Sequence, residues 1–306
     1  MTVQDPATRS LPYRGRFAPS PTGALHLGSL LVAVASWLRA RSRDGAWLVR
    51  IEDIDPPRER VGASAGILAT LAAFGLASDE PVLFQSGRSA AYERALQRLI
   101  AAGRAFPCRC SRQDVLARGG HHGRCSPDAG SKPDPAWRLL APTAPVVFDD
   151  LWQGRQVQDV AATEGDFVIR RSDGLWAYQL AVVVDDHFQG ITEVVRGSDL
   201  LASTARQIAV QKALGLPTPA YLHLPVLLDD DGRKLSKQNL ALPVDAGDPL
   251  PALRRVLAIL GMPAAVRAGT GPPSRMLAAA VGHFAFDRLP RGADLCSATW
   301  QALANR

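Results

Sequence analysis

The sequence is short of lysine and contains no long apolar run. Only four of its 35 basic residues are lysines, and the rest are arginines. The longest apolar stretch, around residues 30–38, falls far short of the ~20 residues that a membrane span requires. The first residues are polar and lack the apolar core of a signal peptide. We therefore expect a soluble, cytoplasmic protein with no membrane partner.

Cysteine is also scarce, with four in 306 residues, which excludes a disulfide scaffold. Three of them, Cys108, Cys110 and Cys125, lie close together in the sequence. In a reducing compartment such clustering favours a metal over a disulfide. Cys296 stands alone, and we interpret it as a buried apolar residue.

Composition and charge set only broad limits. With 47% apolar and 21% charged residues, the chain is neither a disordered tail nor a fibrous repeat. A net charge of +6 fits a nucleic-acid or nucleotide partner. Spread over the whole chain, however, that charge is mild, and a compositional bias towards arginine explains it better.

Apolar strand patterns alternate with amphipathic helix patterns along most of the chain. This alternation predicts an α/β fold with a Rossmann-like parallel sheet and helices on both faces. The expected strands span 13–17, 47–51, 82–85, 167–171, 180–184, 191–195 and 221–228, and the expected helices span 26–42, 62–75, 89–102, 199–214 and 252–260.

The alternation stops between about residues 106 and 165, where glycine, proline and cysteine are frequent and 146–148 is an isolated strand candidate. The simplest interpretation is an α/β domain split by an insertion. The predicted domain boundaries are 13–107 for the first half, 108–165 for the insertion, 166–240 for the second half and 241–306 for a small C-terminal helical part.

The segment RFAPSPTGALHLGSL at 16–30 combines a strand, a Gly/Pro turn and a helix start. His26 and Gly28 lie at the start of this helix, where free backbone N–H groups and the helix dipole favour a phosphate. Gly28 leaves room for a planar base against the helix, and His26 can donate to a phosphoryl oxygen. Taken alone, a histidine at a helix start is more often a cap or a core residue.

The segment DGRKLSKQN at 231–239 places Lys234 and Lys237 three residues apart in a polar loop. Two ammonium groups on such a loop can neutralise a triphosphate as pyrophosphate leaves. A solvated surface loop is the alternative, but the chain uses lysine almost nowhere else. No Ser/His/Asp arrangement appears in the sequence, so we expect no side-chain nucleophile.

Together, HLGS at 26–29 and KLSKQ at 234–238 resemble the HIGH and KMSKS signatures of class I aminoacyl-tRNA synthetases. RIEDIDPPR at 50–58 and VVDDHFQGITEVVRGSDL at 183–200 resemble the glutamyl-tRNA synthetase branch of that family. The resemblance covers roughly residues 13–260. Two positions depart from the usual signatures: Ser29 stands where a second histidine is usual, and Gln238 replaces the final small or basic residue.

The resemblance implies a set of site residues. His26 and Lys237 are the expected catalytic residues. The expected ATP-binding residues are His26, Gly28, Ser29, Lys234 and Lys237. The expected glutamate-binding residues are Arg16, Phe17, Ala18, Pro19, Ser20, Glu52, Tyr178 and Arg196. Two arginines and one carboxylate suit a ligand with two carboxylates and one ammonium, although surface salt bridges or a core tyrosine would leave the same pattern.

Asp185, Asp186 and His187 form a polar group beside an apolar run. We expect them to support the glutamate pocket or to contact a ribose, without a catalytic role.

About 68 residues follow Gln238, which is too few for the anticodon-binding region of a glutamyl-tRNA synthetase. The resemblance is therefore to the truncated paralogues within that branch. It implies ATP-dependent activation of L-glutamate to glutamyl-adenylate, with Mg²⁺ on the ATP. The glutamyl group then passes to queuosine at the wobble position of tRNA(Asp). The expected partners are ATP, L-glutamate and the anticodon arm of that tRNA, and the expected state is a monomer.

Three alternatives remain open from the sequence. The first is a glutamyl-tRNA synthetase that charges the 3′ end of tRNA(Glu). The second is a tRNA-binding paralogue without catalysis, which loss of His26 or Lys237 would favour, but both are present. The third is a small-molecule nucleotidyltransferase of related fold.

The cysteine cluster has the composition of a zinc site. Cys108, Cys110, His121 and Cys125 supply three thiolates and one imidazole for a tetrahedral ion. The family pattern has a tyrosine where this chain has His121, and His122 competes for the same role. We expect one structural zinc ion per chain, with three reduced cysteines and no metal as the alternative.

Overall fold

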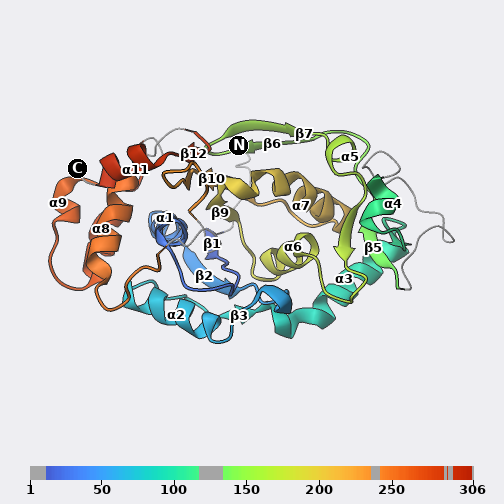
Figure 1. The fold of residues 1–306 in the computed structure, drawn as a ribbon, viewed down its shortest axis with the longest axis horizontal. Coiled ribbons are helices and arrows are strands. Elements are labelled where there is room, and N and C mark those ends of the chain that lie inside the picture. Colours follow the sequence, from blue (N-terminus) through green and yellow to red (C-terminus); the bar gives the residue numbers. More distant parts are fainter. Residues whose placement is uncertain (1–11, 117–133, 236–241, 286–287, 289–291, 305–306) are drawn as a thin grey trace, which may run out of the picture.

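A computed structural model describes residues 12–116, 134–235, 242–285, 288 and 292–304. Two sets of strands form the centre of the molecule (Figure 1). The first is a parallel sheet of β1, β2 and β3, and the second has the order β7-β6-β10-β9. Their bounds are β1 Arg14–Phe17, β2 Ala46–Ile51, β3 Leu83–Phe84, β6 Val146–Asp150, β7 Gly154–Gln158, β9 Glu193–Gly197 and β10 Ala220–Leu224.

The two sheets meet where β1 lies beside β9. The backbone N–H of Thr192, just before β9, donates to the carbonyl of Arg14 in β1 at 2.9 Å. From β1 the chain moves outwards in one direction to β2 and β3, whereas from β9 it moves in the other direction to β10. This reversal is the topological switch point at which open α/β sheets bind ligands, beyond the carboxyl ends of the strands.

Helices cover both faces of this sheet. Neighbouring residues of β9 belong to different cores, because Val195 packs with the first core and Val194 with the second. The first core contains residues of α1 (Leu27–Arg41), α2 (Ala63–Ala73), α8 (Pro249–Ile259) and α10 (Pro273–Val281). The second contains residues of α3 (Ser89–Ala101), α6 (Tyr178–Phe188) and α7 (Leu201–Leu214). Strands buried on both faces explain their nearly continuous apolar runs.

The segment predicted as an insertion contributes to two sheets. Within it, β6 pairs in parallel with β10 at Asp150 and Tyr221, and β7 continues that sheet antiparallel to β6. A separate antiparallel sheet has the order β4-β5-β8, with β4 at Ala105–Cys108, β5 at Ala136–Leu139 and β8 at Phe167–Arg170. The predicted strand at 167–171 is therefore confirmed, but it lies outside the parallel sheet.

Smaller elements complete the described chain. They are α4 (Arg112–Leu116), α5 (Val160–Thr163), α9 (Ala264–Arg267), α11 (Ser297–Ala304), the two-residue strands β11 (Val226–Leu227) and β12 (Asp294–Leu295), and the 3-10 turns η1 (Pro56–Arg58), η2 (Gln85–Arg88) and η3 (Ser198–Leu200). The helices α8, α9 and α11 lie at one end of the molecule, and α4 and β5 lie at the other (Figure 1). Among the described helices, none is long and apolar enough to cross a membrane.

The prediction of a strand at 180–184 was wrong, because these residues form the middle of helix α6. Leu180 to Val183 are all buried, and a short run that is apolar at every position does not distinguish a buried strand from a buried helix. The helix continues through Asp185 and Asp186. It therefore carries, on the same helix, the polar groups that the strand interpretation had placed beside the apolar run.

The prediction of a buried Cys296 was also wrong, because this side chain is exposed. Leu295 in β12 points into the core, and the following residue faces the opposite way, as successive strand side chains do. The Sγ of Cys296 lies 3.0 Å from the Oγ1 of Thr299, and this hydrogen bond lowers the pKa of the thiol.

Candidate active site

The turn after β1 is tied to the end of β2. The backbone N–H of Glu52 donates to the carbonyl of Pro19 at 3.0 Å. Gly23 has φ 144°, a conformation that side chains disfavour, so glycine is needed to complete the turn. The expected glutamate-binding residues on this turn differ in exposure, because Ala18 and Pro19 are half-buried whereas Ser20 is exposed.

Phe17 does not present its side chain to this turn. Its ring stacks on Trp47 within the first core, with the ring centroids 6.5 Å apart. Because successive strand residues face opposite ways, the alternation that turns Arg16 towards the carboxyl edge turns Phe17 into the core. Phe17 can therefore line a pocket only with its backbone.

Two sequence-distant motifs approach each other at the start of α1. His26 is the N-cap residue of this helix, and its ring accepts a hydrogen bond from the backbone N–H of Ser29. A Cβ added at Gly28 would lie 3.1 Å from the His26 ring and 3.8 Å from the carbonyl oxygen of Leu235. Leu235 belongs to KLSKQ, so the two motifs lie side by side, and glycine at position 28 keeps the space between them open.

Lys234 forms an ion pair with Asp199 at 2.5 Å, between side chains that are 43% and 34% exposed. An exposed pair of this kind contributes only about 0–1 kcal/mol, so it can exchange for a phosphate at little cost. Lys237, the second expected lysine, lies outside the described residues.

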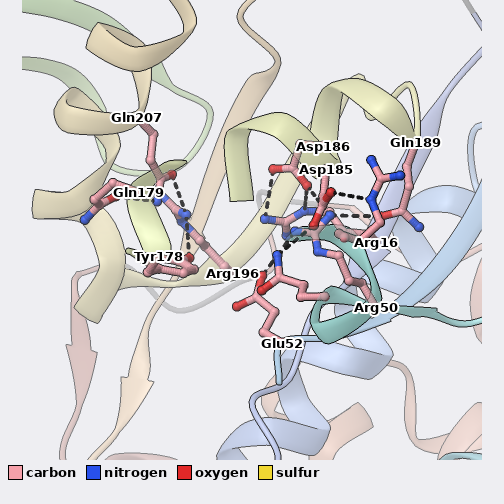
Figure 2. Close-up of polar contacts among 12 residues, drawn as sticks. Arg16, Arg50, Glu52, Tyr178, Gln179, Asp185, Asp186, Gln189, Arg196 and Gln207 are labelled. Carbon is pink, nitrogen blue, oxygen red and sulfur yellow. Dashed lines mark hydrogen bonds and ion pairs between the residues drawn. The ribbon is translucent and has the colours of Figure 1, made fainter. Parts of the chain in front are cut away.

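A buried cluster of two arginines and two carboxylates lies behind the turn. Asp186 on α6 accepts hydrogen bonds from Arg16 Nε at 3.1 Å and from Arg50 Nη1 at 2.7 Å. Arg50 also donates from Nη2 to Glu52 Oε1 at 3.1 Å and from Nη1 to the side chain of Gln189 at 2.9 Å. Figure 2 shows Arg16 and Arg50 converging on Asp186.

Burial and charge act against each other in this cluster. Burial by itself raises the pKa of Asp186, but the positive charges of Arg16 and Arg50 and the bonds that they donate outweigh it and lower the pKa. At Glu52 burial dominates, and its pKa is raised despite the attraction of Arg50 and Arg16. Glu52 is therefore the carboxylate in this cluster that gains most from an additional cationic partner.

Arg16 and Glu52 both keep unused hydrogen-bonding capacity. Arg16 donates to Asp186 from Nε and Nη2 and to the carbonyl of Val195 from Nη1 at 3.4 Å. Within the described chain, this leaves one N–H on each terminal nitrogen without an acceptor. Glu52 Oε1 receives the bond from Arg50, whereas no described residue donates to Glu52 Oε2.

A second buried network surrounds Arg196 on β9. Arg196 Nη1 donates to Gln207 Oε1 at 2.9 Å and to the Tyr178 hydroxyl at 3.3 Å. Its Nη2 donates to Thr204 Oγ1 at 2.8 Å and to the carbonyl of Leu200 at 3.4 Å. All these acceptors are neutral. The Tyr178 hydroxyl accepts from Arg196, so its own proton remains available, and burial raises the pKa of this phenol.

The helix α6 joins the two groups. Tyr178 at its start contacts Arg196, and Asp186 in its last turn contacts Arg16 (Figure 2). Asp185 faces a third set of partners, because it accepts bonds from Gln85 at 2.9 Å, from Arg88 and from Tyr92. Asp186 thus contacts an expected glutamate-binding residue, whereas these partners of Asp185 include none and His187 is exposed, so the expectation that this group supports the pocket stays a prediction.

The candidate zinc ligands are only partly described. Cys108 ends β4, and Cys110 follows two residues later, with both side chains buried. His121, His122 and Cys125 lie outside the described residues. Within the part of the chain that the structure describes, no group of three His, Cys, Asp or Glu side chains is close enough to hold a metal.

Sequence reasoning missed several residues of these networks. Arg50 lies in a quoted motif but was given no role, and Gln207, Thr204 and His223 were not singled out. A lone histidine in an apolar strand such as His223 is more often a core residue, so its type gives no signal. The strand alternation does show that Arg50 and Glu52, two residues apart, lie on the same side of the chain. It does not show that Asp186 lies beside Arg50.

Comparison with known proteins assigns the chain to a family. The family model for the catalytic domain of class I tRNA synthetases (E and Q) matches residues 13–135 and 136–268. The chain therefore belongs to the class I tRNA synthetases of the glutamate and glutamine type. The crystal structure of a glutamate tRNA ligase from Elizabethkingia meningosepticum, in complex with its amino acid, has the same fold, with a TM-score of 0.77 at 24% identity over 96% of this chain and 69% of that one. The expected α/β fold with a parallel sheet is confirmed.

Within that family, the chain's curated relatives include proteins named Glutamyl-Q tRNA(Asp) synthetase. One from Xanthomonas campestris pv. campestris is 57% identical over 95% of this chain and 97% of the relative. Another, from Burkholderia cenocepacia, is 57% identical over 82% of this chain and 89% of the relative. The resemblance to the truncated branch that the motifs indicated is thereby confirmed.

Proposed function

We propose that this protein activates L-glutamate with ATP and transfers the glutamyl group to queuosine at the wobble position of tRNA(Asp). In the first step, the α-carboxylate of glutamate attacks the α-phosphorus of ATP, which forms glutamyl-adenylate and releases pyrophosphate. In the second step, a hydroxyl of the queuosine cyclopentenediol attacks the activated carbonyl and releases AMP. The names of the curated relatives support this reaction.

The observation that carries the proposal is the unused capacity of Arg16 and Glu52. Two free N–H groups on adjacent guanidinium nitrogens suit a carboxylate, which they can bind in a bidentate manner. The free Oε2 of Glu52 suits the ammonium, and the positive charge of the ligand offsets the burial of this carboxylate. Both groups lie at the carboxyl ends of adjacent strands, β1 and β2, so one small zwitterion can reach them together.

Arg196 and Tyr178 provide for a second carboxylate. The hydrogen-bond partners of Arg196 are neutral, so its charge stays available to an anion. The Tyr178 hydroxyl adds a donor beside it. Glutamine would bind here without a negative charge, which disfavours it relative to glutamate.

ATP would bind where HLGS and KLSKQ lie side by side. The start of α1 presents free backbone N–H groups and a positive dipole end to the phosphates. His26 and Ser29 lie at this helix start, Lys234 immediately precedes Leu235 beside it, and Gly28 leaves space against the helix. We assign Lys237 to stabilise the charge that develops as pyrophosphate leaves. Mg²⁺ would supply further charge neutralisation on the phosphates.

One experiment tests the reaction. The protein is incubated with ATP, labelled glutamate and tRNA(Asp), with and without queuosine, and with tRNA(Glu). We expect label only on the queuosine-containing tRNA(Asp). Label on queuosine-free tRNA(Asp), or on the 3′ end of tRNA(Glu), would contradict the proposal and favour an ordinary glutamyl-tRNA synthetase.

The activation step is tested without tRNA by glutamate-dependent exchange of pyrophosphate into ATP. Lys237→Ala should abolish this exchange. Lys212→Ala removes an exposed lysine on α7 that has no role in the proposal, and its exchange should match the wild type. Wild-type exchange in Lys237→Ala would remove this residue from the mechanism.

We further propose one structural zinc ion, held by Cys108, Cys110 and Cys125 with His121 or His122. Two buried thiols two residues apart at the end of a strand suit this role. Protein purified without chelators should contain about one zinc ion per chain. Cys110→Ser should lose it, whereas Cys296→Ser should retain it. Comparing His121→Ala with His122→Ala identifies the fourth ligand, and metal-free wild-type protein would contradict the site.

A further inference from the structure

A buried histidine and a buried aspartate lie in line with Arg196. His223 on β10 and Asp150 at the end of β6 have fully buried side chains. The Nδ1 of His223 lies 2.6 Å from Asp150 Oδ2. Its Nε2 lies 2.9 Å from the Nε of Arg196, which donates to it. The mechanism above uses neither residue.

The geometry fixes the protonation of the imidazole. The Nε of an arginine can only donate a hydrogen bond, so His223 Nε2 must accept. The ring proton therefore resides on Nδ1 and is donated to Asp150. A protonated ring would direct an N–H at the guanidinium of Arg196 and lose this bond.

The groups that face His223 favour this neutral state. Arg196 on β9 and Asp150 on β6 are the charged groups in contact with its ring, Thr204 on α7 adds a hydroxyl at 3.3 Å, and the Tyr221 ring stacks on it. Burial lowers the pKa of His223, and the charge of Arg196 reinforces this against the opposing effect of Asp150. Burial raises the pKa of Tyr221 to about 12, so it stays neutral.

Asp150 is itself held by the backbone. Its Oδ1 accepts from the N–H groups of Trp152 at 3.0 Å, Gln153 at 2.8 Å and His223 at 3.2 Å. These three backbone donors hold the Asp150 carboxylate in place, and the carboxylate in turn orients the His223 ring. The ring then sets the direction of the Arg196 Nε–H. The Arg196 side chain has four rotatable bonds, and the bond to His223 holds it at Nε, while Nη1 stays directed towards Tyr178.

We propose that His223, held by Asp150, is a positioning residue that sets the orientation of Arg196 for a carboxylate of the amino-acid substrate. The inference rests on the proposed role of Arg196 in binding glutamate. It assigns to β6, in the segment between the halves of the α/β domain, a part in substrate recognition.

Two substitutions of His223 separate its two hydrogen bonds. In His223→Gln, the amide oxygen takes the place of Nε2 and can accept from Arg196. In His223→Asn, the shorter amide takes the place of Nδ1 and reaches only Asp150. We expect His223→Asn to raise the KM for glutamate by about 10- to 100-fold, as expected for loss of a hydrogen bond to a charged group. The KM for ATP should not change, and His223→Gln should stay close to the wild type.

Asp150→Asn tests the same relay without changing the ring. The new Nδ2 donor opposite His223 Nδ1 forces the ring proton to Nε2, which turns it against Arg196. We expect this variant to raise the KM for glutamate as His223→Asn does. Tyr221→Phe is the matched control, because Tyr221 lies on the same strand as His223. The substitution removes the buried hydrogen bond that Gln211 donates to the Tyr221 hydroxyl at 2.9 Å, and it keeps the ring.

The pH profile gives a readout that a merely structural role would not change. As the pH falls and His223 becomes protonated, the KM for glutamate should rise in the wild type and rise less in His223→Gln. Glu52 titrates in both proteins, so the difference between the two profiles reports His223.

Three results would overturn the inference: an unchanged KM for glutamate in His223→Asn and Asp150→Asn, an equal rise for glutamate and ATP, or the same rise in Tyr221→Phe. If the wild type shows no glutamate-dependent exchange at all, the proposed function fails instead.

Discussion

Arg16 and Arg196 are both nearly inaccessible, at 3% and 4% exposed, yet the structure uses their donors differently. Arg16 donates to one carboxylate, that of Asp186, and to the carbonyl of Val195, and it keeps two N–H groups without an acceptor in the described chain. Arg196 has an acceptor for each of its five N–H groups, and every one is neutral. Burial and residue type therefore do not reveal how a binding arginine works.

The difference lies in where charge and geometry remain available. Around Asp186, two guanidinium groups face two carboxylates, so the formal charges balance. Arg16 therefore offers a ligand two directed N–H donors but little net positive charge. Around Arg196 every N–H group has an acceptor, but among the residues that the structure describes no carboxylate contacts the guanidinium directly to balance its charge. The cluster around Arg16 suits recognition of a carboxylate by hydrogen-bond geometry, whereas the network around Arg196 suits attraction of an anion by charge.

The largest expected effect comes from removing the charge that balances the first group. Asp186→Asn keeps the shape but leaves Arg16 and Arg50 without their shared carboxylate. Breaking a buried pair in this way destabilises a protein by about 3–5 kcal/mol, which urea unfolding measures. Glu80→Gln alters the exposed pair with Arg14 and should cost at most about 1 kcal/mol. Equal effects of the two substitutions would contradict the balance described for Asp186.

The same substitution predicts a change in pH dependence. The pKa of Asp186 is lowered on folding, so between its folded and unfolded values the unfolded chain binds more protons. Its contribution to stability is present above about pH 4 and is lost as the pH falls through the folded value. Urea midpoints of the wild type should therefore fall more steeply below about pH 4 than those of Asp186→Asn. Parallel curves would show that Asp186 does not titrate in this way.

The next largest effect tests the free donors of Arg16. Arg16→Lys keeps a positive charge but loses the fork, so kcat/KM for glutamate should fall by roughly 100- to 1000-fold, while the KM for ATP changes little. Arg14→Lys is the matched control two residues earlier on β1, where the guanidinium pairs with exposed Glu80. A fall of less than about tenfold in Arg16→Lys would show that charge alone suffices at this position.

The contrast between the two arginines also shows what the sequence can predict. The alternation of strands and helices predicted the parallel sheet, and the motifs identified Arg16, Glu52 and Arg196 as residues at its carboxyl edge. These predictions depend on order along the chain, which a single sequence contains. The helix at 180–184 could not be predicted in this way. When every face of an element is buried, each position is apolar, and the sequence no longer shows whether the period is that of a helix or of a strand.

Partners from distant elements lie beyond such reasoning. The contact between Asp186 and Arg16 joins residues 170 positions apart, and the contact between His223 and Asp150 joins residues 73 apart. Nothing local in either segment specifies its partner. The acidic residues of 183–200 were recognised as part of a motif, but whether each would face an arginine, a tyrosine or solvent depends on how α6 packs.

The smallest expected effect concerns the hydroxyl beside Arg196. In Tyr178→Phe, one N–H of Arg196 Nη1 still donates to Gln207 and the other loses its acceptor, while the substrate loses the donor that the hydroxyl provides. We expect kcat/KM for glutamate to fall by about 10-fold, with an unchanged KM for ATP, and stability to fall by about 1–3 kcal/mol because one buried N–H of Arg196 loses its acceptor. Tyr92→Phe removes a buried hydroxyl that donates to Asp185, and it should reduce stability without this selective kinetic loss. If Tyr178→Phe binds glutamate as well as the wild type, Arg196 alone holds the carboxylate, and the two arginines differ less than their contacts indicate.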